Sequence, residues 1–436
     1  MRLTLIACLL ALAPAPVLAE WQLVHAGNVL DRPGQPARGA TTLVIANGKV
    51  HSLHEGHRAA GELEGVPADA RVIDLRDQFV LPGLIDSHVH LDSDRAGVDA
   101  QLDEVSLSPA AKAFDAAVNA RKTLMAGFTT VRNLGDRDGV TLALRDAVRE
   151  GKVAGPRILD AGTSISATAG HMDGTLGYRE ELHAAIDRHA NTCDGPDDCR
   201  RAVRRQVGRG VDVIKFASTG GVNSRIGAGI GQQIFEDEAR AIVETAHLYG
   251  KKVAVHAHGG DGILLALKVG ADSIEHGTLL DEAGLRAFLD SGAYYVPTLS
   301  TVNGYKERLA KNPEAYTGEV LAKIEWRIAI TGKALRLAHS RGVRIAFGTD
   351  AGVSKHGRNA DEFLLMVEHG MSPADALVAA TVNAADLLGL GAEIGTLETG
   401  KTADLIAVDG NPLEDIATLQ DVRWVIQGGK VVKSPQ

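Results

Sequence analysis

The sequence predicts an α/β protein, a (β/α)8 TIM barrel with a small β-sandwich domain formed by both chain ends. Three observations predict this fold. Eight short apolar runs alternate with amphipathic helical stretches, polar residues stand at the ends of several runs, and both chain ends contain strand-like runs without a long helix. The chain has 436 residues and is 45% hydrophobic, which suffices for one large domain and a smaller one.

The chain opens with a predicted secretory signal peptide, residues 1–19. Arg2 precedes an apolar core, and small residues continue to Ala19, after which we expect cleavage. The apolar core is too short to span a membrane, and a lipoprotein site at Cys8 is disfavoured because almost no apolar segment precedes it. We therefore expect an exported protein, either periplasmic or secreted.

The first and last parts of the mature chain are expected to build the β-sandwich domain together. Residues 20–80 and 393–436 contain short runs with the composition of strands. The sequences ANGK at 46–49 and QGGK at 427–430 fit the turns of hairpins. Strands from the two ends are therefore predicted to pair into one small domain beside the barrel.

Residues 81–392 are expected to form the barrel. Its eight predicted strands cover residues 84–90, 127–133, 156–162, 211–217, 252–258, 272–277, 293–298 and 343–349. Helical patterns lie between them, for example at 108–126 and 235–250, and several are followed by glycine, as helix ends often are. A doubly wound open sheet would show the same alternation. The count of eight and the polar residues at the strand ends favour the barrel.

Composition restricts the partners of the protein. The formal net charge of −9 at pH 7 leaves no basic surface for nucleic acid, which is therefore excluded. We expect a small-molecule partner, no membrane span, and a homo-oligomer.

Two cysteines remain after the signal peptide, Cys193 and Cys199, in the turn-rich segment NTCDGPDDCRR. In an exported protein such a pair favours a disulfide that closes a small loop. A metal site is the alternative, although the sequence offers no further thiolate partner. The disulfide would stabilise the loop locally and would have no part in catalysis.

Histidines and one aspartate at the predicted strand ends indicate a metal centre. His88 and His90 are two residues apart, so on a strand both imidazoles face the same side. His256, His276 and Asp350 follow three other apolar runs. Each alone has a structural explanation, but in a barrel all of them meet at the C-terminal mouth, where active sites lie. Imidazole nitrogen and carboxylate oxygen suit zinc or a similar divalent ion.

A lysine at the end of another apolar run needs a separate explanation. Lys215 follows Val213 and Ile214 in the predicted strand at 211–217, and lysine is rarely buried without a partner. A buried ion pair, or an amine that reaches out to solvent, would be a purely structural role.

The motifs PGLIDSHVH, VDVIKFASTGG, VAVHAHG, SIEHG, GTDAGV and GTLETGKTADLIAVDGNP resemble those of the amidohydrolase superfamily of metal-dependent hydrolases. The resemblance covers nearly the whole mature chain. Within the superfamily, VIKFASTGGV and GTDAGVSKHGRNADEF are most similar to the branch of Xaa-Pro dipeptidases and carboxypeptidase-like amidohydrolases, which includes ochratoxin-hydrolysing enzymes.

This resemblance implies two divalent metal ions, with zinc expected, and a carbamate formed on Lys215 from carbon dioxide. The carbamate would bridge the metals, and it requires a neutral amine, which burial favours. A metal-bridging hydroxide would attack the amide carbonyl, and Asp350 would carry its proton to the leaving amine. The implied ligands are His88, His90 and Asp350 for one metal, and His256 and His276 for the other, with Lys215 between them.

The implied reaction is hydrolysis of the amide bond to a C-terminal amino acid, in a dipeptide, an N-acyl amino acid, or a phenylalanine amide of the ochratoxin A type. Three residues near the implied site are candidates for substrate contact. His171 lies in the loop after the third strand, Arg225 lies in the loop after Lys215, and His258 follows His256 by two residues.

Two other functions remain open. A mononuclear deaminase or cyclic amide hydrolase of the same fold would not use a carbamylated lysine, so Lys215 argues against it. A non-catalytic metal-binding barrel would be expected to lack ligands, and none is missing from this set. Metal content, and hydrolysis with and without a chelator, would separate the three functions.

Overall fold

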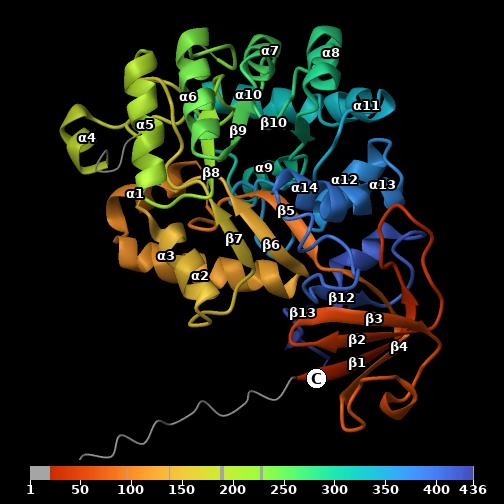
Figure 1. Cartoon of the computed structure of the whole chain (residues 1–436). Coiled ribbons are helices and arrows are strands. Elements are labelled where there is room, and N and C mark those ends of the chain that lie inside the picture. The colour runs from red at the N-terminus through yellow and green to blue at the C-terminus, as the bar shows by residue number, and fades with distance from the viewer. Residues whose placement is uncertain (1–19, 96, 137, 187–190, 226–228, 436) are drawn as a thin grey trace, which may run out of the picture.

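The computed structural model describes residues 20–95, 97–136, 138–186, 191–225 and 229–435, and the predicted signal peptide lies outside these ranges. A sheet built from the chain ends stands beside a larger body of strands and helices (Figure 1). None of the helices in the described ranges is both long enough and apolar enough to cross a membrane.

Seven strands from both ends of the chain form one sheet, in the order β14-β13-β12-β4-β1-β2-β3. Pairing is antiparallel throughout except between β1 and β4, which run parallel. The strands that were predicted to form a sandwich thus belong to one continuous mixed sheet. The strands are β1 (Trp21–Val29), β2 (Thr41–Ala46), β3 (Lys49–Glu55), β4 (Arg71–Pro82), β12 (Leu405–Val408), β13 (Val422–Gln427) and β14 (Lys430–Lys433).

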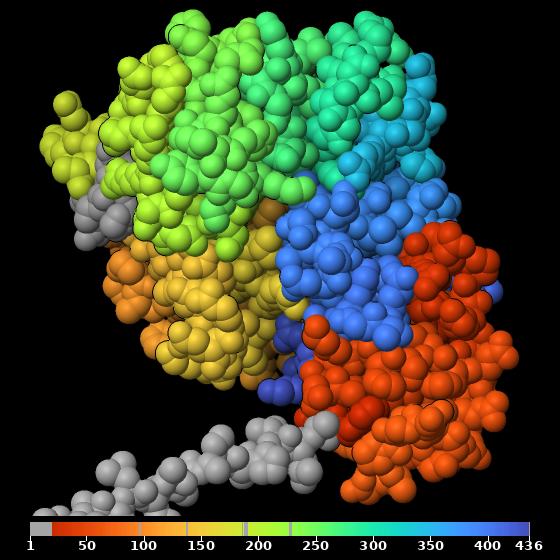
Figure 2. Space-filling view, in the orientation of Figure 1, coloured from red at the N-terminus to blue at the C-terminus, as the bar shows by residue number. Residues whose placement is uncertain are grey.

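The two faces of this sheet belong to different hydrophobic cores. On β12, Ile406 and Val408 join the large core of the barrel body, whereas Leu405 and Ala407 join the core of the sheet itself. This alternation follows from the two-residue period of a strand. One face of the sheet therefore packs against the body, and Figure 2 shows N-terminal segments in red and orange against C-terminal segments in blue.

The strands of the body form two parallel sheets, of three and of four strands. Because all strands within each sheet run in parallel, their carboxyl ends lie at the same edge. The three-stranded sheet contains β5 (Leu84–Val89), β6 (Phe128–Asn133) and β7 (Arg157–Asp160), and the four-stranded sheet contains β8 (Val213–Ala217), β9 (Lys252–Ala257), β10 (Ser273–His276) and β11 (Tyr294–Val296).

Isolated bridges connect the two sheets on both sides. Ile165, which follows β7, pairs in parallel with Phe216 of β8. The eighth predicted strand, 343–349, is not a regular strand, because it pairs with β11 only at the bridge between Tyr295 and Ile345. The backbone N–H of Ser87 donates to the carbonyl of Phe347 at 2.9 Å, which ties this segment to β5.

Helices connect the strands, largely as the sequence pattern predicts. Between β5 and β9 they are α1 (Val98–Ser106), α2 (Pro109–Met125), α3 (Val140–Arg149), α4 (Glu180–Ile186), α5 (Pro196–Gly208) and α6 (Glu236–Leu248). From β9 onward they are α7 (Gly260–Lys268), α8 (Glu282–Ser291), α9 (Thr301–Lys311), α10 (Gly318–Ala329), α11 (Lys333–Ser340), α12 (Asp361–Glu368), α13 (Pro373–Val378) and α14 (Ala384–Leu387).

The described residues also contain three shorter helical turns. They are η1 (Ala60–Glu62) between β3 and β4, the π-helical turn η3 (Ala379–Asn383) between α13 and α14, and η4 (Ile416–Gln420) before β13.

Local sequence explains where the predicted helix at 108–126 begins and ends. The hydroxyl of Ser108 accepts a hydrogen bond from the backbone N–H of Ala111, and proline occupies the first turn of α2. Gly127, just beyond the end of α2, has φ of 96°, a conformation that glycine adopts without steric cost.

A disulfide joins Cys193 and Cys199. Both cysteines are buried, and Cys199 lies in the first part of α5. The bond therefore closes a short loop at the start of a connecting helix.

Two helices between β11 and 343–349 were not anticipated by the sequence pattern. Besides α11, this connection contains α9 and α10, which form a small core with Val222 from the loop after β8. Tyr305 of α9 accepts a hydrogen bond from Asn223 of the same loop at 3.2 Å. The pair α9–α10 therefore packs over the loop that follows the carboxyl end of β8.

Packing of the sheet against the body can be tested with Ile406→Ala. Ile406 is fully buried on the face that meets the body, so its truncation should lower the free energy of unfolding by roughly 2–5 kcal/mol. The control Val72→Ala alters a strand residue that is 50% exposed and should change it by less than about 0.5 kcal/mol. Equal urea midpoints for the two variants would contradict this packing.

Candidate metal centre

The predicted ligand residues meet at the carboxyl ends of the strands. His88 and His276 belong to β5 and β10, and their ring centroids are 5.2 Å apart. The ring of His90, just beyond β5, is 5.4 Å from that of His88. The ring centroid of His256, on β9, lies 4.6 Å from that of His276. Three strands that are distant in the sequence thus contribute histidines to one centre, and Asp350 joins them from the position just after the 343–349 segment.

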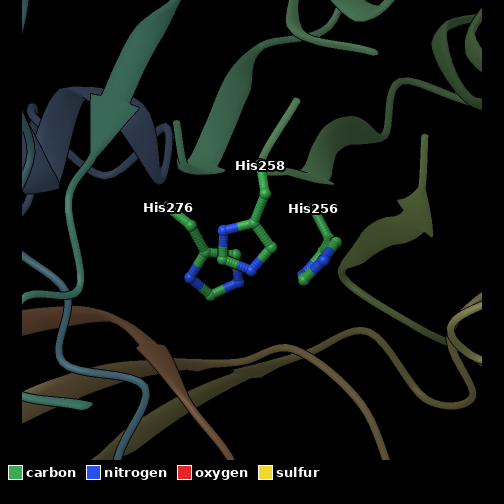
Figure 3. A group of neighbouring side chains, drawn as sticks. All are labelled: His256, His258 and His276. Atoms are coloured by element: carbon green, nitrogen blue, oxygen red, sulfur yellow. The ribbon is translucent and has the colours of Figure 1, made fainter. Parts of the chain in front are cut away.

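Two groups of side chains have the geometry to hold a metal ion. One contains His88, His276 and Asp350, and the other contains His256, His258 and His276; within each group the ligand atoms lie within 4.8 Å of one another. Figure 3 shows the three histidines of the second group turned toward one another. His276 is common to both groups, so the two positions are contiguous.

Two histidines are oriented by side chains that bind their Nδ1 atoms. Nδ1 of His88 donates to Glu275 Oε2 at 2.9 Å, and Nδ1 of His276 lies 2.7 Å from Thr298 Oγ1. Each ring therefore keeps Nε2 for a metal. Partners of this kind are typical of metal-ligating histidines, because they fix the ring and its tautomer.

Two further histidines are oriented by backbone carbonyls. Nδ1 of His90 bonds to the carbonyl of Gly135 at 3.1 Å, and its Nε2 lies 3.4 Å from Asp350 Oδ1. His256 is held in the opposite sense, because its Nε2 bonds to the carbonyl of Gly220 at 3.3 Å. Nδ1 is thus the nitrogen that His256 keeps for a metal.

The predicted substrate residue His258 lies within the centre itself. Its Nδ1 is 2.8 Å from Thr278 Oγ1, and its ring stacks on that of His276 with centroids 4.8 Å apart. His171, the other predicted histidine, has its ring centroid 4.2 Å from that of His256. A Cβ on Gly221 would lie 2.1 Å from the His171 ring, so this contact requires glycine after β8.

Lys215 presents a buried amine to the centre. The residue is 1% exposed, and its Nζ makes no hydrogen bond with any described residue. Burial lowers the pKa of Lys215 to about 8, and Arg132 contributes in the same direction, although Glu275 and Asp350 act to raise it. The amine is therefore neutral in an appreciable fraction of molecules near neutral pH. A buried ion pair does not account for this lysine.

Asp350 faces His88 and His90, and neighbouring residues fix its position. Its backbone N–H donates to the carbonyl of His88 at 2.7 Å. Burial raises the pKa of Asp350 to about 7, against the opposing effect of Lys215. Asp86 accepts a hydrogen bond from Thr349 Oγ1 at 2.6 Å, so the residue before Asp350 is anchored to β5.

The backbone at the centre is strained at three positions. His276, Thr298 and Asp350 have φ values of 72°, 48° and 54°, which side chains other than glycine rarely adopt, a β-branched one least of all. Such strain costs on the order of 1–3 kcal/mol per residue and gathers at functional sites. Here it directs two proposed ligands and the hydroxyl that orients one of them.

A buried ion pair under the centre was missed in the sequence. Arg132 of β6 donates to Glu275 Oε1 at 2.9 Å and to the carbonyl of Ser87 at 2.6 Å. Burial alone would raise the pKa of Glu275, but Arg132 and the hydrogen bond with His88 outweigh it and lower that pKa to about 2. A charged residue inside an apolar run was the available signal, as it was for Lys215.

A cleft with a volume of about 520 Å³ opens beside the centre. Its walls include two of the predicted substrate residues, His171 and Arg225, and also the ligand His90. The cleft is thus open to a small molecule next to the proposed metal positions, whereas His258 is buried in the centre.

Comparisons with known proteins agree with this geometry. The amidohydrolase family matches residues 79–432. An ochratoxinase from Aspergillus niger is 32% identical over 438 residues, which cover 96% of this chain and 88% of that enzyme. A solved Xaa-Pro dipeptidase with methionine bound in its active site is 39% identical with a TM-score of 0.88, covering 95% of this chain and 100% of the other. A solved prolidase in complex with N-methylphosphonate-L-proline is 30% identical with a TM-score of 0.85, again covering 95% and 100%.

The ion pair between Arg132 and Glu275 can be tested with a double-mutant cycle. Glu275→Gln or Arg132→Met leaves one buried charge without its partner and should cost roughly 3–5 kcal/mol of the free energy of unfolding. The double variant should cost less than the sum of the two, because neither charge remains. As a control, Glu236→Gln removes the partner of the exposed Arg240 and should cost no more than about 0.5 kcal/mol. Additive costs, measured by urea denaturation of metal-free protein, would contradict this coupling.

Proposed function

The chain belongs to the amidohydrolase family and is a hydrolase of amide or peptide bonds, and on that premise we propose that it is a binuclear enzyme that releases a C-terminal amino acid from a dipeptide or an N-acyl amino acid. The family assignment confirms the resemblance inferred from the motifs. The observation that carries the proposal is the buried, unpartnered amine of Lys215 among the ligand-type residues. The substrate class is supported by the dipeptidase neighbour, whose active site holds methionine.

The donor set supports two divalent ions, for which zinc is the proposed metal because nitrogen and oxygen donors suit it. When bound, such ions acidify a water molecule and polarise the scissile carbonyl. The assignment gives His88, His90 and Asp350 to one ion, His256 and His276 to the other, and Lys215 to both.

Lys215 can supply a shared anion if its neutral amine attacks carbon dioxide. The nitrogen lone pair forms the N–C bond, one N–H proton leaves, and the product is a carbamate with one negative charge and two donor oxygens. Burial of Nζ favours the neutral amine that this step needs. A mononuclear deaminase or cyclic amide hydrolase has no use for such a lysine.

Asp350 and His258 have distinct proposed roles in the reaction. Asp350 accepts a proton from the attacking water at its carboxylate and passes it to the leaving amine, and its contacts with His88 and His90 place it beside the proposed metal for both steps. His258, held by Thr278, presents Nε2 to the carbonyl oxygen of the substrate, where negative charge develops.

Two structural proposals accompany the function. The bridges at Ile165–Phe216, Tyr295–Ile345 and Val89–Ala351 support a closed (β/α)8 barrel. Export is supported by the pattern of residues 1–19 together with the disulfide, since disulfides persist in oxidising compartments.

The reaction can be tested with purified, metal-loaded protein and a library of dipeptides and N-acyl amino acids. We expect release of the C-terminal amino acid, two metals per chain, and loss of activity on exhaustive chelation. Full activity in protein that contains no divalent metal would refute the proposal.

Lys215→Arg tests the carbamate directly. Arginine keeps the positive charge but stays protonated and cannot form a carbamate. Loss of a residue that merely orients a metal ligand costs roughly 10- to 100-fold in activity, so kcat/KM of Lys215→Arg should fall by more than that. Lys215→Ala should fail similarly but regain some activity with added short carboxylic acids. A fully active Lys215→Arg enzyme at saturating metal would eliminate the carbamate.

His256→Gln and His258→Gln should separate a ligand from a substrate contact. His256→Gln should lower the metal content, measured by mass spectrometry, below two ions per chain. His258→Gln should keep both ions while kcat falls on the order of 100-fold, because a preorganised donor is lost. Loss of metal in His258→Gln would instead make His258 a ligand.

A further inference from the structure

Helix α10 presents two basic residues toward the metal centre, Lys323 and Arg327, which are four residues apart and thus one turn apart. The helix packs with α9 over the loop that follows β8. Trp326, between the two basic residues, has its ring 6.5 Å from the ring of His258. This part of α10 therefore borders the centre.

Arg327 is a buried cation without a counter-ion. The residue is 3% exposed, and its two hydrogen bonds, to the carbonyls of Pro297 and Thr298, are both 3.5 Å long. No described carboxylate forms an ion pair with it. Glu362, the carboxylate with the largest electrostatic effect on Arg327, already accepts two backbone N–H groups, those of Leu299 and Ser300.

A buried charge without a counter-ion lowers the stability of the folded protein unless a group of opposite charge pairs with it. Lys323 adds to the cost, since like charges one helical turn apart repel each other. Its Nζ bonds to the carbonyl of Gly221 at 2.9 Å and to that of Ser224, and no described carboxylate pairs with it either. Arg327 is thus an enclosed positive charge, with the ammonium of Lys323 one turn away, that an anionic group would neutralise.

Arg327 also lies close to the proposed reaction. Thr298, whose carbonyl receives the long hydrogen bond from Arg327, orients His276 through its hydroxyl. Trp326, the neighbour of Arg327 on α10, faces the ring of His258, so a group bound to Arg327 would lie on the same side of the centre as a carbonyl held at His258.

We propose that Arg327, with Lys323 beside it, binds the free carboxylate of the substrate and makes the enzyme specific for amides of α-amino acids. The inference rests on the proposed function and names the part of the substrate that this site selects. A guanidinium forms two parallel hydrogen bonds with a carboxylate. A substrate with a carboxamide in place of the carboxylate would leave Arg327 unpaired, and sites of that kind discriminate strongly. Arg225, in the wall of the cleft, is the competing candidate.

The test compares two substrates that differ only at the carboxylate. A dipeptide that the wild type hydrolyses is paired with its C-terminal amide, and kcat/KM is measured for both. We expect the wild type to prefer the free acid. In Arg327→Met, kcat/KM for the acid should fall on the order of 100-fold, whereas the value for the amide should change by only a few-fold. Arg336→Met, an exposed arginine on α11, should keep the wild-type preference.

A binding measurement separates this inference from the proposed function. Calorimetric titration with free methionine and with methionine amide should show that the wild type prefers methionine and that Arg327→Met does not. If the wild type hydrolyses neither substrate, the proposed function fails while the titration still decides the role of Arg327. Arg327→Lys keeps a cation and should retain part of the preference, even if Arg327→Met fails to fold. Retention of the full preference in Arg327→Met, or its loss in Arg225→Met alone, would overturn the inference.

Discussion

Charges buried between the strands have to be balanced, and the arrangement of the centre depends on that constraint. The pair between Arg132 and Glu275 is complete, and Glu275 uses its second oxygen to orient His88. Lys215 and Asp350 are buried beside it without a hydrogen bond between them. A carbamate on Lys215 would convert a cation into an anion, which is favourable only if cations bind nearby. On the proposed function, the carbamate and the metals would therefore stabilise each other.

The features that could be predicted from the sequence are those that leave a regular spacing of residues. Alternating apolar runs indicated the strands, and the spacing of His88 and His90 indicated a shared face. Residues that orient the ligands escaped prediction, because a glutamate before His276 or a threonine after β11 is ordinary in sequence and gains its role only from contacts across the barrel. The segment 343–349 departs from the predicted regular strand because of contacts that are also invisible in the sequence. Its backbone forms hydrogen bonds with β5, β11 and η3, and the strained residue Asp350 follows it.

The additional helices show where prediction from pattern stops. The apolar pattern did not predict α9 and α10, and it does not tell which part of the body they cover. Basic residues on a half-buried helix usually reach solvent with their charged ends. Arg327 does not, and only the folded structure distinguishes a solvated arginine from one enclosed beside a catalytic centre. In the proposed enzyme, the connection that contains α9 and α10 would set the choice of substrate, while the strand ends would set the chemistry.

Because Pro82 pairs with Leu405 in the shared sheet, the order of synthesis matters for how this protein matures. A ribosome makes β1 to β4 first, yet their partner β12 is among the last segments to emerge. Contacts between distant segments slow folding, so the apolar face of β4 stays uncovered until nearly all of the chain has been made. Premature closure would trap an edge prone to aggregation. If the protein is exported as proposed, the same delay would be an advantage, since it would favour an unfolded polypeptide until the last strands have been made.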